Sequence, residues 1–249
     1  MVAGVAGLVA AAWLFRPNLT SAERGRRLAE ANGCFACHGP EGSKGVANAG
    51  RTDGDVPSYG SLMMYASNPE EVREWIANGV TKAKLKSETW KKERNQGTLR
   101  MPAFGHRLTS REIDDLVAFV MAAAGEPTPQ DSVAAAGRDR AEALGCMGCH
   151  GSGGRYARRN PGSLKGYVPP WDGADFTELV QNEAEFREWV ERGSSRRFEE
   201  NPIANFFLDR GTLHMPAFRG KLEPGDLEAL WAYIQWLRPP VKPDGGPRS

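Results

Sequence analysis

Apolar residues recur at intervals of three and four along two long stretches of the chain, which is the spacing of one face of a helix. One stretch follows Thr109, and the other runs from Leu227 to Leu237. No stretch alternates apolar and polar residues regularly enough to predict a strand. The pattern therefore predicts an all-α fold.

Capping residues indicate where the first helices begin and end. Thr20 or Ser21 can cap a helix that runs to about Asn32, and Ser132 can cap an equivalent helix further along the chain. Each of these helices ends just before a string that contains cysteines. We therefore expect the two helices to play the same structural role.

Three further helices have clear start signals. Asn68 precedes a proline and two glutamates, which suit the first turn of a helix, and Gly79 ends this helix. Residues 182–193 have the same pattern. Thr109 and Glu112 form a capping box in front of the first apolar stretch.

The second half of the chain repeats the first. Residues 48–57 correspond to residues 160–169, and residues 71–120 correspond to residues 185–234 after an insertion of two residues. The chain is therefore two copies of one unit. We place the parts at residues 1–16 (a hydrophobic segment), 17–126 (first domain), 127–131 (a linker), 132–238 (second domain) and 239–249 (a flexible tail).

Charge and hydropathy exclude two classes of protein. Lysine plus arginine (32) nearly balance aspartate plus glutamate (31), so no global field recruits nucleic acid. A mean hydropathy of −0.50 excludes a polytopic membrane protein.

All four cysteines belong to Cys-x-x-Cys-His strings, at residues 34–38 and 146–150. This string is the attachment signal for c-type haem, because two thiols three positions apart can form thioethers with one porphyrin edge and place the next histidine beneath the iron. A zinc site would need the two pairs closer in sequence, and a disulfide would not explain the histidines. The predicted attachment residues are Cys34, Cys37, Cys146 and Cys149, with His38 and His150 as the adjacent imidazoles.

Each unit resembles the class I c-type cytochromes, because a helix precedes the Cys-x-x-Cys-His string, a Met-Pro follows it and an amphipathic helix closes the unit. The resemblance implies two tandem class I cytochrome c domains that carry two covalently bound haem c groups. It also implies that His38 and His150 are proximal iron ligands and that Met101 and Met215 are distal ligands. A methionine sulfur favours ferrous iron and raises the potential relative to two imidazoles.

Other interpretations of the distal ligands must be considered. Methionine is ordinarily a core residue, but Met101 and Met215 each begin an identical Met-Pro-Ala-Phe string. His214 is an alternative ligand of the second iron, although the matching residue of the first unit is Arg100.

The resemblance suggests further contacts around each haem. A loop carbonyl that accepts a hydrogen bond from the proximal imidazole is expected at Pro161, although the matching residue is an alanine. Tyr59 and Trp171 occupy matching positions and either donate to a haem propionate or pack on the haem edge. Gly25 and Gly137 also match and are expected to let the first and last helices of each unit cross closely.

The N-terminal segment suggests a location. Residues 1–15 carry no charge and are mostly apolar, but they are fewer than the about 20 residues of a spanning helix. They lack the basic start of a secretory signal, and residues 10–12 are only a weak cleavage site. Because the family attaches haem outside the cytoplasmic membrane, we predict an uncleaved transmembrane anchor with both haem domains in the periplasm. Cleavage near Trp13 would remove this anchor.

Basic side chains gather in a loop before Met101 and again after the second haem string. Such a run is usually a solvated surface, but it can steer an acidic redox partner at a rate that falls with salt. The two groups are Lys82, Lys84, Lys86, Lys91, Lys92 and Arg94, and Arg155, Arg158 and Arg159.

Two function classes remain. An electron carrier keeps both irons closed, is not itself an enzyme, and relays single electrons between a donor and an acceptor protein, here as a subunit or tethered partner of a respiratory or photosynthetic complex. A dihaem redox enzyme of the peroxidase or thiosulfate-oxidising type needs one displaceable distal ligand. The two matching Met-Pro-Ala-Phe strings favour the carrier.

Overall fold

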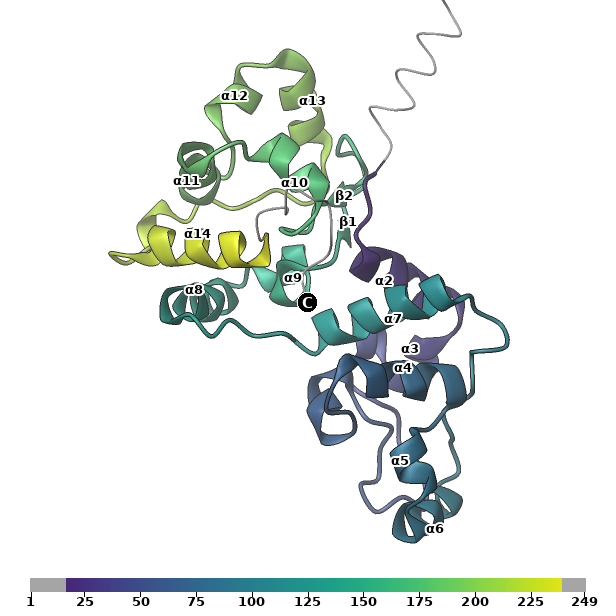
Figure 1. The fold of residues 1–249 in the computed structure, drawn as a ribbon. Helices are drawn as coiled ribbons and strands as arrows, with labels where there is room; N and C mark the ends of the chain where they lie inside the picture. The colour runs from purple at the N-terminus through teal and green to yellow at the C-terminus, as the bar shows by residue number, and fades with distance from the viewer. Residues whose placement is uncertain (1–16, 239–249) are drawn as a thin grey trace, which may run out of the picture. The chain divides into compact units, whose positions relative to one another are not determined.

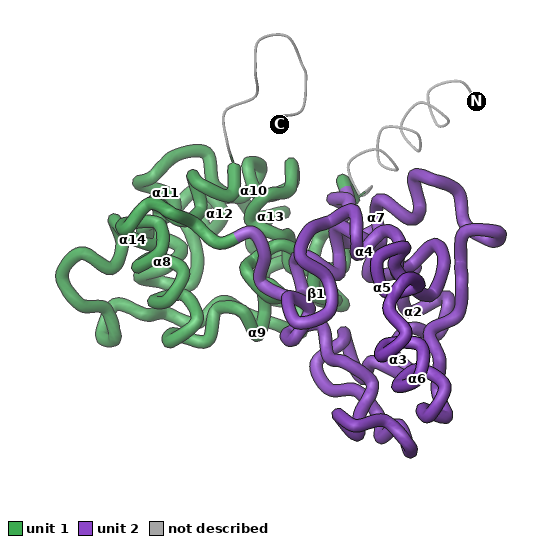
Figure 2. Tube along the Cα trace, turned by 60° about the horizontal axis from the view of Figure 1, so that its bottom comes forward, with its two compact units in different colours: residues 1–18, 128–249 green, residues 19–127 purple. Residues whose placement is uncertain are grey.

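The computed structural model describes residues 17–238, which form two compact units (Figure 2). One unit, the first domain, spans Leu19–Pro127, and the other, the second domain, comprises residues 17–18 and 128–238. Both consist mostly of helices joined by loops (Figure 1). The predicted anchor (residues 1–16) and the predicted tail (residues 239–249) lie outside the described residues.

Two long helices frame the first domain, α2 (Ser21–Ala31) and α7 (Ser110–Ala123), and they pack against each other. A Cβ on Gly25 would lie 1.9 Å from the carbonyl oxygen of Asp115, so the close crossing requires glycine, as predicted. Between them lie α3 (Cys34–His38), η1 (Pro40–Gly42), η2 (Tyr59–Met64), α4 (Pro69–Asn78), α5 (Lys82–Leu85) and α6 (Glu88–Gln96).

The second domain repeats this frame with α8 (Ser132–Ala143) and α14 (Asp226–Leu237). A Cβ on Gly137 would lie 1.9 Å from the carbonyl oxygen of Ala229, which confirms the matching expectation. The other elements are α9 (Met147–His150), η3 (Ser152–Gly154), β1 (Arg158–Arg159), β2 (Tyr167–Val168), α10 (Ala174–Leu179), α11 (Glu183–Arg192), α12 (Arg196–Glu199), α13 (Pro202–Arg210) and η4 (Arg219–Lys221).

The prediction of a helical fold is therefore confirmed, with one departure in the described part of the chain. Strands β1 and β2 pair antiparallel, with Arg158 opposite Val168. Each strand has two residues, which is too short to give a visible alternation in the sequence.

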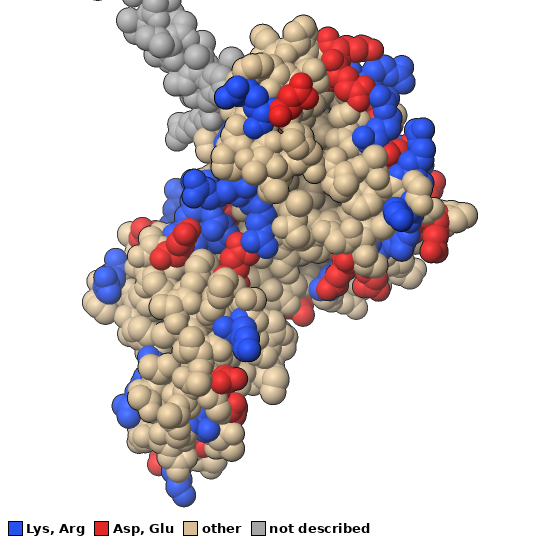
Figure 3. Space-filling model, turned by 180° about the vertical axis from the view of Figure 1, so that it is seen from behind, with Lys and Arg blue, Asp and Glu red and all other residues tan. Residues whose placement is uncertain are grey.

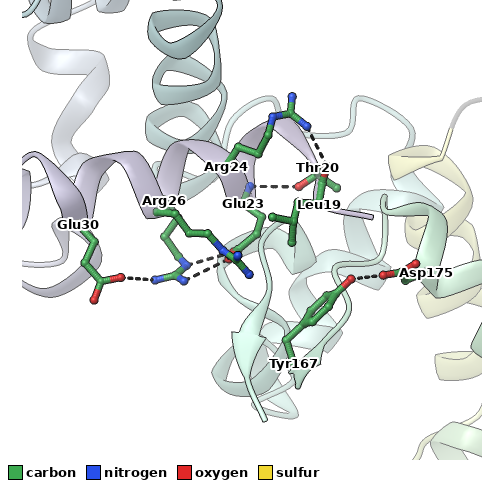
Figure 4. Close-up of polar contacts among 9 residues, drawn as sticks. Leu19, Thr20, Glu23, Arg24, Arg26, Glu30, Tyr167 and Asp175 are labelled. Atoms are coloured by element: carbon green, nitrogen blue, oxygen red, sulfur yellow. Dashed lines mark hydrogen bonds and ion pairs between the residues drawn. The ribbon is translucent and has the colours of Figure 1, made fainter. Parts of the chain in front are cut away.

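Most helices begin where their capping residues predicted. The Thr20 hydroxyl accepts a hydrogen bond from the first turn of α2 (Figure 4), and Asn68 and Asn182 cap α4 and α11 in the same way. The prediction that Ser132 caps α8 is wrong. Asp131 caps this helix, because its backbone is extended and its carboxylate accepts from the N–H groups of Val133 and Ala134 in the first turn, whereas Ser132 is already helical.

The lysine-rich segment before Met101 is not the loop that we expected. It forms α5 and α6, whose starts are capped by the side chains of Thr81 and Ser87. The corresponding segment of the second domain forms α12 and α13. The segment therefore presents its basic side chains on short helices.

The surface carries both signs of charge. On the face shown in Figure 3, basic and acidic side chains lie next to one another, in keeping with the net charge of +1. Among residues 17–238, no helix combines the length and the apolar character needed to cross a bilayer.

Candidate functional site

Each Cys-x-x-Cys-His string forms a short helix directly after the first long helix of its domain. Gly33 and Gly145, with φ of 75° and 76°, turn the chain between the two helices. All four cysteines are free thiols, so each is available for thioether formation. Burial raises the pKa of the Cys34 thiol, and it raises the pKa of the Cys146 thiol to about 11.

The proximal imidazole of each domain is anchored by a proline carbonyl. The Nδ1 of His38 lies 2.8 Å from the carbonyl oxygen of Pro57, and the Nδ1 of His150 lies 3.4 Å from that of Pro169. When Nδ1–H donates to this carbonyl, Nε2 carries no proton and can bind a metal.

The carbonyl that binds the imidazole does not belong to the residue that we expected. The carbonyl of Pro161 accepts hydrogen bonds from the backbone N–H and the hydroxyl of Thr212, both at 3.0 Å, and so it does not serve the imidazole. The equivalent carbonyl of Ala49 is bound in the same way by Thr98. The expectation for Pro161 is therefore wrong, because this loop faces the segment before the methionine.

Burial also keeps both imidazoles neutral. Removal from water lowers the pKa of His38, and it lowers the pKa of His150 to about 4, while the bond to the proline carbonyl opposes the shift in each case. The neutral form is the one that ligates a metal, so both histidines are ready for iron at neutral pH.

An aromatic ring packs on each imidazole. The ring centroids of Tyr59 and His38 are 5.0 Å apart, and those of Trp171 and His150 are 4.9 Å apart. Phe119 and Tyr233 in turn meet these aromatic rings edge-on. These contacts place Tyr59 and Trp171 against the imidazoles, while packing on the haem edge and the propionate contact both stay predictions.

The methionine of each Met-Pro-Ala-Phe string is held against the end of a helix. In the first domain, the Phe104 N–H donates to the carbonyl of Ile76 on α4 at 3.0 Å. Gly79, which ends this helix at φ 69°, is so close that a Cβ would lie 2.4 Å from the carbonyl oxygen of Met101. The positive φ and the lack of space both require glycine at this position.

The second domain repeats this arrangement. The Phe218 N–H donates to the carbonyl of Val190 on α11 at 2.9 Å. A Cβ on Gly193, at φ 85°, would again lie 2.4 Å from the carbonyl oxygen of the methionine, here Met215.

A cavity of about 610 Å³ brings the predicted site residues of the second domain together. It is lined by Cys146, Cys149, His150 and Met215, and by apolar side chains such as Phe176, Trp189 and Leu230. His214 also lines the cavity, but it is exposed, whereas Met215 is half-buried.

The cavity and its donor atoms fit a covalently bound haem. Its volume lies within the range of about 300–1,000 Å³ that is usual for cofactor pockets. Two thiols, a neutral imidazole and a thioether are the attachment and axial groups that haem c uses. In the first domain, the same residue types occupy the matching positions of α3 and of the segment that follows α6.

Sequence analysis did not assign a role to Asn48 and Asn160, although both recur at matching positions. In the structure both are buried, and each binds the backbone two residues before a predicted distal methionine. The signal that could have identified them is the repetition of Asn-x-Gly together with Gly-Thr-Leu in both domains.

Each of the two groups of basic residues contains exposed and half-buried side chains. The side chain of Lys82 is 81% exposed and lies 3.5 Å from Glu74. By contrast, Arg155 is half-buried, with its Nε 3.8 Å from the carboxylate of Asp172. Burial of that carboxylate raises the pKa of Asp172 to about 6, although Arg155 opposes the shift.

Two family models match the chain, one for each of the two repeated units. Residues 22–124 match the family model of cytochrome c, and residues 132–234 match that of cytochrome c oxidase, cbb3-type, subunit III. A comparison with curated proteins finds no match to the chain.

Proposed function

We propose that this chain, a c-type cytochrome with two domains, relays single electrons between proteins through two covalently bound haem c groups, one in each domain. Cytochrome c domains transfer electrons, and bound haem iron supplies a reversible one-electron change. The observation that carries the proposal is the duplication of the site. Paired thiols, an anchored imidazole and a methionine held at a helix end recur in both domains.

The residues of each domain have separate roles in holding the haem. The thiols would bind the group covalently, and the proline carbonyl orients the imidazole. The methionine thioether would be a second ligand of the iron, and apolar side chains such as Phe176 and Leu230 would exclude water from the second site. An iron held by both an imidazole and a methionine would have no position left for a substrate, which suits a carrier rather than an enzyme.

The family match of the second domain supports a role beside an oxidase. We propose that the chain is a subunit or tethered partner of a respiratory oxidase complex. We further propose that residues 1–16 anchor it in the cytoplasmic membrane, with both domains in the periplasm. The uncharged, apolar sequence of residues 1–15 supports the anchor.

Mass spectrometry of the denatured protein tests haem attachment. We expect a mass increase of two haem groups, and the loss of one group in each double variant, Cys34→Ala/Cys37→Ala and Cys146→Ala/Cys149→Ala. A protein that sheds its pigment on denaturation would refute the proposal. A high-spin iron in the intact oxidised protein would favour the redox-enzyme alternative, because it reports an open distal position.

Purification of the native full-length protein in mild detergent tests its membrane anchoring and its association with an oxidase. We expect it in the membrane fraction, together with oxidase subunits, and with residues before Trp13 intact on N-terminal sequencing. A mature N-terminus near Trp13, or recovery from the periplasm without detergent, would contradict the anchor.

A further inference from the structure

A buried asparagine in the first domain binds both backbone groups of one residue near the distal methionine. The Oδ1 of Asn48 accepts from the N–H of Leu99 at 2.8 Å, and its Nδ2 donates to the carbonyl of Leu99 at 3.1 Å. Asn48 is 3% exposed, so neither bond can be replaced readily by water. Leu99 stands two residues before Met101.

The second domain has the same pair of bonds. The Oδ1 of Asn160 accepts from the N–H of Leu213 at 2.7 Å, and its Nδ2 donates to the carbonyl of Leu213 at 3.0 Å. Asn160 is 6% exposed. The contact spans 53 residues of sequence here and 51 in the first domain, so local chain geometry does not create it.

The surrounding backbone is shaped to admit this contact. In the first domain, a Cβ on Gly50 would lie 2.0 Å from the carbonyl oxygen of Gln96, which leaves no room for a side chain, whereas one on Gly97 would be in ordinary contact with the Asn48 amide nitrogen, at 3.4 Å. In the second domain, the matching distances for Gly162 and Gly211 are 2.0 Å and 3.2 Å. In each domain, the Asn-x-Gly segment and the Gly-Thr-Leu segment therefore lie directly against each other.

We propose that Asn48 and Asn160 are positioning residues that keep Met101 and Met215 in place as iron ligands. This inference rests on the proposed function, because it assumes that these methionines bind iron. The helix end holds the C-terminal side of each methionine, and the asparagine holds the N-terminal side. Since the methionine sulfur forms a weak bond to iron, its occupancy depends on how little the chain on either side can move.

The test uses the full-length, haem-loaded protein and one variant for each domain, Asn48→Ala and Asn160→Ala. Imidazole added to the oxidised protein competes with methionine, and loss of the sulfur-to-iron charge-transfer band reports the exchange. We expect each variant to bind imidazole about tenfold more tightly at its own haem, as expected for the loss of buried hydrogen bonds, with the other haem unchanged. The control is Asp131→Ala, which removes the helix cap of α8 rather than of a helix that holds a methionine, and should leave the imidazole affinity as it is.

Unchanged imidazole affinity in a folded Asn48→Ala or Asn160→Ala protein would overturn the inference. An equal change at both haems, or in Asp131→Ala, would do the same, because it would indicate general destabilisation. If the variants do not fold, hydrogen exchange of the unaltered protein decides. The Leu99 and Leu213 amides should exchange about a hundredfold more slowly than those of Arg100 and His214, and equal rates would refute the contact.

Failure of the proposed function has a different signature. In that case the unaltered protein would lack the sulfur-to-iron band, and Met101→Leu and Met215→Leu would not change its spectrum. Failure of the asparagine role alone would leave the band present in the unaltered protein and sensitive to both methionine substitutions.

Discussion

The two domains hold their predicted iron ligands in the same way but differ in what surrounds them. The asparagine, the glycine at the helix end and the proline carbonyl recur at matching positions. Helix α6 carries lysines, whereas the matching helix α13 exposes Ile203 and Phe206, at 71% and 53%. The comparison indicates that ligand geometry restricts the interior of each domain, while the surface can adapt to different partners.

The surroundings of the imidazole differ as well. The second domain has Trp171 in place of Tyr59, and a longer imidazole–carbonyl distance. It also has the half-buried carboxyl of Asp172 where the first domain has Gly60. Hydrogen bonding and burial tune haem potentials, so we expect the two potentials to differ.

Substitution of the methionines gives the largest expected effect and tests the symmetry of the ligands. Met101→Leu and Met215→Leu should each remove the sulfur-to-iron band of one haem. Each should also lower the potential of that haem by about 0.1 V or more, within the roughly 0.8 V that axial ligands span. Redox titration with optical detection measures both. If Met215→Leu has no effect, His214 is the ligand and the symmetry of the two sites is broken.

Alanine at the helix-end glycines should give the next largest effect. Gly79→Ala and Gly193→Ala combine a positive φ with a Cβ only 2.4 Å from a methionine carbonyl oxygen, and should cost about 3 kcal/mol of unfolding free energy. Gly54→Ala and Gly166→Ala are matched controls, because both have φ of 75° and open space around the Cβ. They should cost about 1 kcal/mol, from backbone strain alone. Chemical denaturation measures the loss of unfolding free energy in both pairs of variants. Equal losses in the two pairs would show that the methionine segment moves away from the added Cβ at little cost.

The sequence predicted those features of the site that depend on short spacings. The haem strings, the helix caps at Thr20 and Asn68, and the glycine crossings were all read from local patterns or from the repeat. The proline whose carbonyl binds the imidazole was misplaced at Pro161, because three prolines follow the string before α10 and spacing alone does not say which carbonyl the loop turns inward.

The asparagine contact was missed for a similar reason. Asn48 and Leu99 are joined by a contact across 51 residues, and only the folded chain places them together. Repetition marked Asn48 and Asn160 as equivalent, but it did not say what either one binds.

Asp172 should give the second domain a pH dependence of stability that its first-domain counterpart, Gly60, cannot have. Its pKa is about 6 in the folded protein, against an ordinary value of 3.8, so the folded state binds the proton more tightly. Its contribution to stability is therefore present below pH 3.8 and is lost as the pH rises through about 6. Between pH 4 and pH 7, the unaltered protein should lose about 2 kcal/mol more unfolding free energy than Asp172→Asn.

Denaturant titrations at both pH values measure this difference, and Asp209→Asn, at an exposed carboxylate of α13, is the control. The control should show the same pH dependence as the unaltered protein. If Asp172→Asn does so too, the carboxyl is ionised at little cost, and the two domains are electrostatically more alike than the structure indicates.

The smallest expected effect concerns the surfaces of α5 and α6. Replacement of Lys82, Lys84, Lys86, Lys91 and Lys92 by glutamine should slow electron exchange with an acidic redox protein by about tenfold at low salt. The difference should shrink as the ionic strength passes 0.1 M, where the Debye length falls to about 10 Å. Stopped-flow kinetics over a salt series measures this.

The matched variant is Ile203→Ser/Phe206→Ser on α13, which removes apolar surface at the positions that correspond to Thr89 and Lys92. Because this variant changes no charge, it should leave the salt dependence as it is. A salt dependence that survives loss of the lysines would place electrostatic docking elsewhere on the molecule, and the basic helices would then be only a solvated surface.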